Sequence, residues 1–236
     1  MYAKSAAVYD ALYLARGKDY AAEAAAVHAL IQQRKRSHGQ SLLDVGCGTG
    51  GHLAHFARWY DAEGLDLSAE MLAAARDKCS GVPLHRADMT DFDLGRTFDA
   101  VVCLFSSIGY VRTAAGLQRA VQTMARHLRP GGVLAVEPWL SPADVGRGGM
   151  GLTAADEPGL KVARIFANRV EGRLLVMDWH FLVGTPEGVE TFTERHETGL
   201  FTPDEYLAAF DAAGIQATYE PDPALERGLY VGVTGS

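Results

Sequence analysis

A glycine-rich turn between a short apolar segment and a helix is the feature that most constrains the fold of this chain. Residues 41–45 predict a buried strand, and the run Gly46-Cys47-Gly48-Thr49-Gly50 turns the chain into a helix predicted over residues 52–59. Glycines permit a tight turn and a close approach of the backbone to a ligand. The start of the helix offers free backbone N–H groups. We therefore expect a ligand to bind at this turn.

Strands and helices alternate around the turn. Strands are predicted to end at Asp66, Arg86, Phe105 and Glu137, and helices are predicted over residues 20–34, 69–78 and 114–128. The stretch Thr202-Pro203-Asp204-Glu205 is typical of a helix start. Two closing strands follow, over residues 216–220 and 228–233. This alternation predicts an α/β fold with a doubly wound, mostly parallel sheet and helices on both of its faces.

The pattern changes after Trp139. Residues 141–159 are rich in Gly and Pro and predict a loop. Three segments of alternating polarity then predict antiparallel strands joined by tight turns, over residues 162–170, 173–183 and 189–200. We therefore divide the chain into an α/β domain, residues 1–140 and 201–236, and an antiparallel β insertion, residues 141–200, that covers the active site.

Charge and composition argue against several classes of protein. The 236 residues carry a net charge of -7 and their Lys and Arg are scattered, which disfavours nucleic acid and anionic membrane surfaces as partners. No apolar run approaches the roughly 18 residues of a membrane span, and residues 1–10 do not resemble a signal peptide. Cys47, Cys79 and Cys103 lack metal-ligand spacing, so we expect no metal site, and reduced thiols in a cytoplasmic protein.

Acidic residues end two of the predicted strands. Asp66 ends the second strand, 20 residues after Gly46, where it can accept hydrogen bonds from both hydroxyls of a ribose. Asp88 and Met89 end the third strand region, where the acid can meet an adenine amino group and the methionine can cover its ring. Phe105 ends the fourth strand. The carboxyl ends of parallel strands are where open α/β sheets bind their ligands.

The glycine spacing leaves two cofactors open. Only Gly51 completes a G-x-G-x-x-G register, so the register alone does not exclude a dinucleotide. A P-loop is excluded because Gly-Lys-Ser/Thr is absent. The acids at Asp66 and Asp88 favour S-adenosylmethionine (SAM).

A family resemblance points the same way. Residues 42–89 resemble motifs I and II of the class I SAM-dependent methyltransferases, and the alternation from Ser41 onward resembles their seven-stranded, Rossmann-like fold. The resemblance implies SAM as the cofactor. The implied contacts to it are Gly46, Cys47, Gly48, Asp66, Leu67, Asp88, Met89 and Phe105.

A closer resemblance spans nearly the whole chain, to the N,N-dimethyltransferases of TDP-3-amino-deoxysugars such as desosamine and mycaminose. The matching stretches are Val8-Tyr9-Asp10, Gly17-Lys18-Asp19-Tyr20, Gly51-His52-Leu53, Asp88-Met89-Thr90-Asp91-Phe92, Phe105-Ser106-Ser107-Ile108-Gly109-Tyr110, Val136-Glu137-Pro138-Trp139 and Arg227-Gly228-Leu229-Tyr230. Leu140-Ser141-Pro142 departs from the family, which has a second Trp and then Phe-Pro at this place, and this leaves the sugar open. Val45-Gly46 replaces the family's Val-Ala.

This resemblance assigns further residues. It implies that the N-terminal segment is a helical lid that brings Tyr2 to the sugar and Tyr9 to the cofactor, with Arg16 on the methionine carboxylate. It also implies that Trp139 contacts the substrate and that Arg227 binds the diphosphate, a task that suits the fork of donors on an arginine.

The candidate catalytic residues are Tyr110, just after the fourth strand, and Glu137, at the end of the fifth. Tyr110 is placed to hold the amine in line with the methyl group or to pass a proton outward, and Glu137 to contact a sugar hydroxyl or an amine. We expect His180 and His196 to be half-buried structural residues. We expect the remaining basic candidates, Arg147, Lys161 and Arg164, to be surface residues.

The sequence therefore predicts an N-methyltransferase that acts on a TDP-linked amino-deoxyhexose in antibiotic biosynthesis, twice on one nitrogen. The oligomeric state stays open, with a homodimer as one candidate. Two alternatives stay open. One is methylation of another small amine or hydroxyl, and the other is a non-catalytic SAM-binding regulatory protein.

Overall fold

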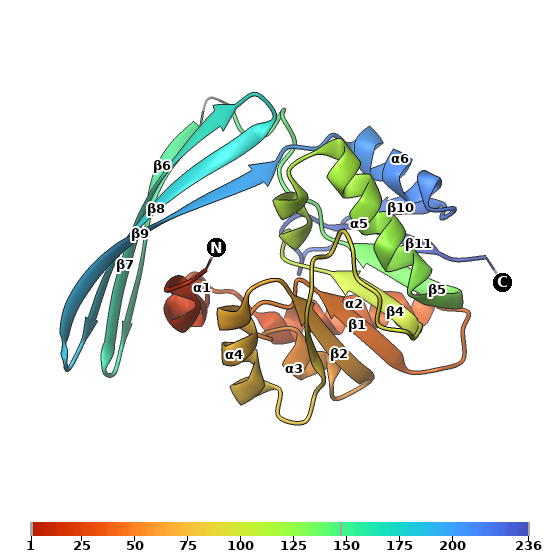
Figure 1. Cartoon of the computed structure of the whole chain (residues 1–236), viewed down its shortest axis with the longest axis horizontal. Helices are drawn as coiled ribbons and strands as arrows, with labels where there is room; N and C mark the ends of the chain where they lie inside the picture. The colour runs from red at the N-terminus through yellow and green to blue at the C-terminus, as the bar shows by residue number, and fades with distance from the viewer. Residues whose placement is uncertain (1, 147, 236) are drawn as a thin grey trace.

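A seven-stranded sheet forms the centre of the molecule (Figure 1). The computed structural model describes residues 2–146 and 148–235. The strands follow the order β10-β11-β5-β4-β1-β2-β3. Their bounds are β1 (Ser41–Val45), β2 (Asp61–Asp66), β3 (Leu84–Arg86), β4 (Phe98–Cys103), β5 (Leu128–Val136), β10 (Ala217–Glu220) and β11 (Leu229–Val233). Strands β1 to β5 are parallel, and β11 runs antiparallel to β5 and β10, which confirms the expected fold class.

Helices cover both faces of this sheet, because its central strands are apolar on both sides. In β4, Val101 and Cys103 pack into one core with helices α5 (Ala114–Arg126) and α6 (Pro203–Ala212). Ala100 and Val102 pack into a second core with helices α2 (Tyr20–Arg34), α3 (Leu53–Phe56) and α4 (Ala69–Lys78). Figure 1 shows the two layers of helices on opposite sides of the strands. None of the described helices is long and apolar enough to cross a membrane.

The helix boundaries follow the local chemistry. The side chain of Thr202 accepts a hydrogen bond from the N–H of Glu205, and the carboxylate of Glu205 accepts one from the N–H of Thr202. This pair of bonds confirms the predicted start of α6. Helix α3 is shorter than predicted. After Phe56 the chain tightens, with Arg58 N–H donating to His55 at 3.1 Å and Trp59 N–H donating to Phe56 at 2.9 Å. This tight turn brings the chain to the start of β2.

A second, four-stranded antiparallel sheet is formed by β6 (Gly148–Glu157), β7 (Leu160–Glu171), β8 (Leu174–Thr185) and β9 (Gly188–Gly199), in that order. The loop predicted over residues 141–159 was wrong where β6 lies. Strand β6 pairs only with β7 at the sheet edge. Its first half is largely exposed, with Met150 at 84%, and buried positions alternate only at Thr153 and Ala155, too short a stretch to indicate a strand among the glycines. Gly151 contacts the ring of Phe166, where a larger residue would clash.

The N-terminal segment joins the two sheets. It comprises η1 (Ser5–Val8) and α1 (Tyr9–Ala15), and its Val8 and Leu12 pack on the inner face of the second sheet. On its other side, Asp10 accepts a hydrogen bond from Thr49 of the glycine turn at 2.7 Å and forms an ion pair with Lys78 of α4. Figure 1 shows α1 between the second sheet and α4. The segment therefore lies over the glycine turn.

Candidate active site

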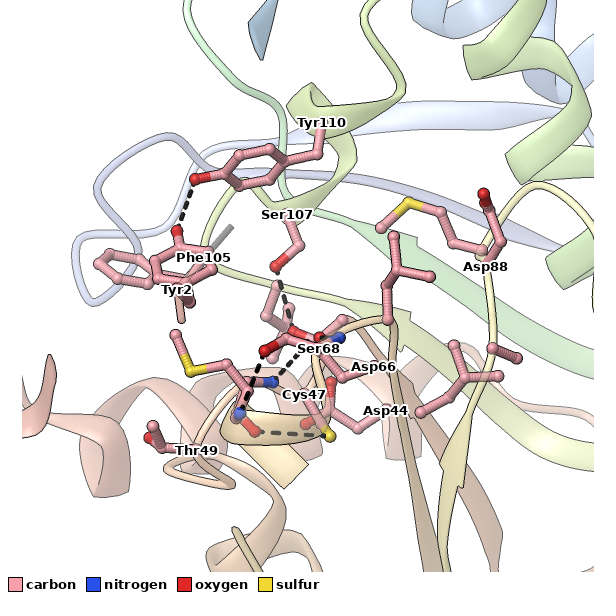
Figure 2. A pocket seen from close by; sticks show the side chains of 18 of the residues that line it. Tyr2, Asp44, Cys47, Thr49, Asp66, Ser68, Asp88, Phe105, Ser107 and Tyr110 are labelled. Atoms are coloured by element: carbon pink, nitrogen blue, oxygen red, sulfur yellow. Dashed lines mark hydrogen bonds between the residues drawn. The ribbon is translucent and has the colours of Figure 1, made fainter. Parts of the chain in front are cut away.

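A cavity of about 610 Å³ opens above the carboxyl ends of β1, β2 and β4, beneath the N-terminal segment. Figure 2 shows the side chains that line it. The structure brings most of the predicted site residues together here, namely Tyr2, Tyr9, Gly46, Cys47, Gly48, Asp66, Leu67, Asp88, Met89, Phe105 and Tyr110. Arg16, Glu137, Trp139 and Arg227 do not line this cavity.

The glycine turn is held by its neighbours on β2. The N–H of Gly46 donates to the carbonyl of Leu65 at 2.7 Å, and the N–H of Gly48 donates to Asp66 Oδ2 at 2.9 Å. The other oxygen of Asp66 accepts from the N–H of Ser68 at 2.8 Å. Gly46 and Gly48 have φ values of 73° and 56°, which favour glycine. Burial raises the pKa of Asp66, and the bonds from Ser68 and Gly48 oppose this rise. The turn and the carboxylate thus form one preorganised unit.

Asp44 is a cavity residue to which the sequence analysis assigned no role. It ends no strand, but it lies within β1, is 2% exposed and lines the cavity. Within residues 2–146 and 148–235, its Oδ2 has no hydrogen-bond partner. Burial, and then the nearby charge of Asp66, raise the pKa of Asp44 to about 7. A buried carboxyl with a free oxygen suits a cationic ligand group. The available signal was an acid in an otherwise apolar strand, directly before the glycine turn.

Asp88 and Met89 flank the mouth of the cavity. Asp88 is exposed. Its Oδ1 stabilises a turn of the chain, because it accepts hydrogen bonds from the N–H of Thr90 at 2.8 Å and from the Thr90 hydroxyl at 2.7 Å. Its Oδ2 has no bond to the described residues. Met89 is half-buried and Leu67 is 52% exposed, so both offer apolar surface to a ligand at this end.

Strained backbone follows β4. Phe105 and Ser106 have φ values of 49° and 59°, which residues with side chains rarely adopt. The turn is held because the N–H of Phe105 donates to Glu137 Oε2 at 2.6 Å and the hydroxyl of Ser106 donates to the carbonyl of Pro138 at 2.7 Å. It leads into η2 (Ser107–Val111), which carries Tyr110 into the cavity.

The carboxylate of Glu137 thus accepts a hydrogen bond from the backbone of this turn. It is 1% exposed, and burial raises its pKa to about 7 although Lys18 and the Phe105 N–H oppose the rise. The structure does not bring this carboxyl to the cavity surface.

Arg16 is also outside the cavity. It is exposed at the end of α1, with its guanidinium 5.9 Å from the centre of the Tyr13 ring. The half-buried cation nearby is Lys18, whose ammonium lies 3.5 Å from the centre of the Phe105 ring and 2.6 Å from Glu23 Oε2. Lys18 lies in the family-like stretch Gly17-Lys18-Asp19-Tyr20 but was not among the predicted site residues.

Trp139 and Arg227 lie together, away from the cavity lining. The Arg227 guanidinium stacks 4.8 Å from the centre of the Trp139 ring. Two of its nitrogens donate to Glu226, at 2.9 and 3.0 Å. The buried Nε of Arg227 and Nε1 of Trp139 have no acceptor within the described part of the chain. Their unused N–H groups suit an anionic or polar ligand.

The remaining basic candidates fall into different surroundings. His180 is exposed and His196 is fully buried, so the expectation that both are half-buried was wrong. Arg164 was expected at the surface but is 3% exposed, because its guanidinium stacks 4.5 Å from the centre of the Trp179 ring. Lys161 is an exposed residue, as expected, and pairs with Asp156. Arg147 lies outside the described residues.

The doubly wound sheet, the glycine turn and the strand-end carboxylates define a class I SAM-dependent methyltransferase. A family model described as a methyltransferase domain matches residues 42–132. A dTDP-3-amino-3,4,6-trideoxy-alpha-D-glucopyranose N,N-dimethyltransferase of Streptomyces venezuelae is 46% identical over 96% of this chain and 96% of its own length. The chain belongs to this family, the TDP-amino-deoxysugar N,N-dimethyltransferases.

Other relatives agree in sequence and structure. A dTDP-4-amino-2,3,4,6-tetradeoxy-D-glucose N,N-dimethyltransferase of Saccharopolyspora spinosa is 43% identical over 96% of this chain and 91% of its own. The crystal structure of DesVI of Streptomyces venezuelae superposes with a TM-score of 0.92, at 45% identity, covering 98% of this chain and 99% of that one. SAM-bound CalS10 of Micromonospora echinaspora, an amino pentose methyltransferase involved in calicheamicin biosynthesis, gives 0.85 at 44% identity, covering 96% of each chain.

Proposed function

We propose that this enzyme transfers methyl groups from SAM to the amino group of a TDP-linked amino-deoxyhexose, twice on the same nitrogen, in antibiotic deoxysugar biosynthesis. The names of the relatives support this substrate class. The observation that carries the proposal is that one cavity joins the strand-end acids to the hydroxyls of Tyr2 and Tyr110. A cofactor held by the acids would present its methyl group toward those hydroxyls, where an amine can be oriented.

The cavity residues suit the parts of SAM. We assign the ribose hydroxyls to Asp66, the adenine amino group to Asp88, and the faces of the adenine to Leu67 and Met89. The orphaned oxygen of Asp44 suits the ammonium of the methionine portion. The backbone of Gly46, Cys47 and Gly48, together with Tyr9 and Phe105, completes the lining.

The methionine carboxylate needs a cation. Arg16 was the candidate from the family resemblance. Neither Arg16 nor Lys18 lines the cavity, but the half-buried Lys18 contacts the ring of Phe105, which does, so we prefer Lys18 for this role. The exposed side chain of Arg16 would have to swing inward.

The substrate residues extend from the cavity toward β11. We assign the amine to Tyr110 and Tyr2, and the diphosphate to Arg227, with Trp139 supporting its guanidinium. Glu137 acts as a positioning residue, because its carboxyl fixes the strained turn that presents Phe105 and, through η2, Tyr110. The second sheet, with the N-terminal lid, is placed to exclude water from the reacting groups.

The chemistry places few demands on acid–base groups. When bound, SAM supplies a methyl group that is already activated by the positive charge on sulfur. The protein must align the amine nitrogen with that methyl group and exclude water. The amine must be neutral when it attacks, and it can lose its proton in water before it binds.

Replacing Tyr110 with Phe is therefore expected to lower the rate of the first methylation only about 3- to 30-fold, below the roughly 10²–10⁴ typical for loss of a general base. The ring stays and the amine loses one hydrogen-bonding partner. Steady-state kinetics across pH test this expectation, and mutant and native profiles should share the limb set by the substrate ammonium. A loss above about a thousandfold with intact substrate binding, or a missing limb, would identify Tyr110 as an obligatory base.

We also propose a cytoplasmic homodimer. The three cysteines are free and buried, as suits a reducing compartment. The outer face of the second sheet exposes the side chains of Met150, Leu152, Ile165, Leu182 and Val189. A second copy of the chain would cover such a face. Sedimentation of Ile165→Glu should give a monomer where the native enzyme gives a dimer, and a monomeric native enzyme would contradict this assembly.

A further inference from the structure

A chain of polar side chains leads from the cavity into the second sheet. Tyr110 Oη lies 2.5 Å from Tyr2 Oη and 3.0 Å from His196 Nδ1. Figure 2 shows the contact between the two tyrosine hydroxyls. On the far side of the imidazole, His196 Nε2 lies 3.4 Å from Glu194 Oε2, within ion-pair range, and has no hydrogen-bond partner among the described residues. His196 is 0% exposed, and the side chain of Glu194 is 10% exposed. The chain thus runs from the substrate cavity to a buried carboxylate.

Glu194 is fixed as an ionised group. Its oxygens accept from the hydroxyl of Ser5 at 2.5 Å and from the N–H groups of Lys4 and Ser5 at 3.0 and 3.2 Å. Burial alone would raise the pKa of Glu194, but the nearby imidazole of His196 and the bonds from Ser5 and Lys4 lower it to about 2. A carboxylate opposite Nε2 places the hydrogen of the neutral imidazole on that nitrogen, which leaves Nδ1 as an acceptor.

Tyr110 then has a defined set of partners. Its hydroxyl donates to His196 Nδ1, and one of its two lone pairs accepts from Tyr2. One lone pair is left for an N–H group in the cavity. Burial raises the pKa of the Tyr110 phenol above its ordinary value, so a free phenolate is disfavoured. If the Tyr110 oxygen takes up a proton from the cavity, the hydroxyl must therefore give its own proton to His196 Nδ1 at the same time.

The surroundings of His196 isolate it from water. Trp179 of β8 stacks on the imidazole, with ring centres 3.9 Å apart, and the guanidinium of Arg164 of β7 stacks on Trp179. The ring of Tyr2, from the N-terminal segment, lies with its centre 4.7 Å from that of the imidazole, and Tyr9 packs against Tyr2. Asp178 and Arg195 pair with each other at strand positions on the opposite face of the sheet from His196, and Arg195 also lines the cavity. Glu194 is thus the one carboxylate that, among the described residues, pairs with His196.

We propose that Tyr110, His196 and Glu194 form a proton relay that acts between the two methyl transfers. This inference rests on the proposed function and deepens it. After the first transfer the nitrogen bears the new methyl group and a positive charge, and it cannot attack again until it loses a proton. Its N–H gives that proton to the Tyr110 oxygen while the O–H proton of Tyr110 passes to His196 Nδ1.

The step balances without a redox partner. The N–H bond of the methylated amine breaks and its electron pair stays on nitrogen, so the amine becomes neutral. Tyr110 ends as it began, and His196 becomes an imidazolium that faces the carboxylate of Glu194. When the product leaves, the proton returns through Tyr110 to water in the open cavity.

Two conservative variants separate a relay from a structural role. His196→Asn keeps an oxygen near the place of Nδ1 to accept from Tyr110 but cannot take up a proton. Glu194→Gln keeps the hydrogen-bonding shape and removes the charge that stabilises the imidazolium. His38→Asn, the same substitution at an exposed position before β1, is the control.

Time courses with excess SAM, analysed by mass spectrometry for mono- and dimethylated sugar, test the relay across pH. In His196→Asn and Glu194→Gln we expect the first methylation within about threefold of native and the second slowed at least about tenfold, so that monomethylated sugar accumulates. Raising the pH should restore the second step, because water then removes the proton. His38→Asn should behave as native.

The spectrum of the resting enzyme gives a second readout. In ¹⁵N-histidine spectra, the signals lost in His196→Asn should belong to an imidazole with its hydrogen on Nε2. A hydrogen on Nδ1, an unchanged product ratio at every pH, or equal slowing of both steps in a variant with native SAM affinity would each overturn the relay. If the native enzyme does not methylate the amino sugar at all, the proposed function is contradicted. The ¹⁵N spectra would still show which nitrogen of His196 carries the hydrogen.

Discussion

Replacing Asp66 with Ala is expected to weaken SAM binding by about 1.5–3 kcal/mol, or roughly ten- to 150-fold in Kd. Asp66 is held by the N–H groups of Gly48 and Ser68, with both of its oxygens still able to accept from a ribose. Removing the carboxylate deletes these charged acceptors and leaves the N–H of Gly48 without its partner. Isothermal titration calorimetry with SAM measures the effect.

The same strand supplies the control for this experiment. Asp61 begins β2, far from the cavity, and its side chain is 72% exposed, so Asp61→Ala should leave SAM affinity unchanged. Asp66→Asn keeps one acceptor oxygen and should fall between the native enzyme and Asp66→Ala. A folded Asp66→Ala protein with native SAM affinity would contradict the assignment of Asp66 to the ribose.

Replacing Arg227 with Met is expected to raise the KM for the nucleotide sugar at least about tenfold, while SAM affinity stays near normal. Methionine keeps part of the apolar packing on Trp139 and removes the guanidinium that we assign to the diphosphate. Steady-state kinetics with each substrate varied in turn separate the two ligands.

Two matched variants sharpen the Arg227 experiment. Glu226→Gln removes the carboxylate that competes for the guanidinium, so its KM should be equal to or lower than that of the native enzyme. Arg58→Met removes an exposed arginine after α3 and should change neither constant. Equal losses of sugar and SAM binding in Arg227→Met would indicate a folding defect and would remove the diphosphate assignment.

Local patterns were enough to predict the main sheet and the glycine turn and strand-end acids that line one cavity. The turn at Gly46 and Gly48 and the acids at Asp66 and Asp88 were identified because a parallel strand brings its carboxyl end to a fixed edge of the sheet. These contacts depend on residues a few positions apart or on neighbouring strands. The capping box at Thr202 is local in the same way.

Long-range packing limited the remaining predictions. The edge strand β6 buries only Thr153 and Ala155, so its exposed, glycine-rich first half indicated a loop. His196 is separated by 86 residues from Tyr110, and only the folding of the second sheet brings the two together. Glu137 lies at the strand end where it was predicted, but its carboxyl bonds to the backbone of Phe105 and does not face the cavity. Tertiary contacts of this kind leave no trace in local spacing.

The most direct test of the account is turnover of a TDP-linked 3-amino-deoxyhexose by the purified enzyme with excess SAM, with the products resolved by mass spectrometry. The account predicts a monomethylated and then a dimethylated sugar nucleotide, both methyl groups on one nitrogen, and two molecules of S-adenosylhomocysteine formed for each dimethylated sugar. S-adenosylhomocysteine formation no faster than without the sugar, or a methyl group found on oxygen, would contradict it.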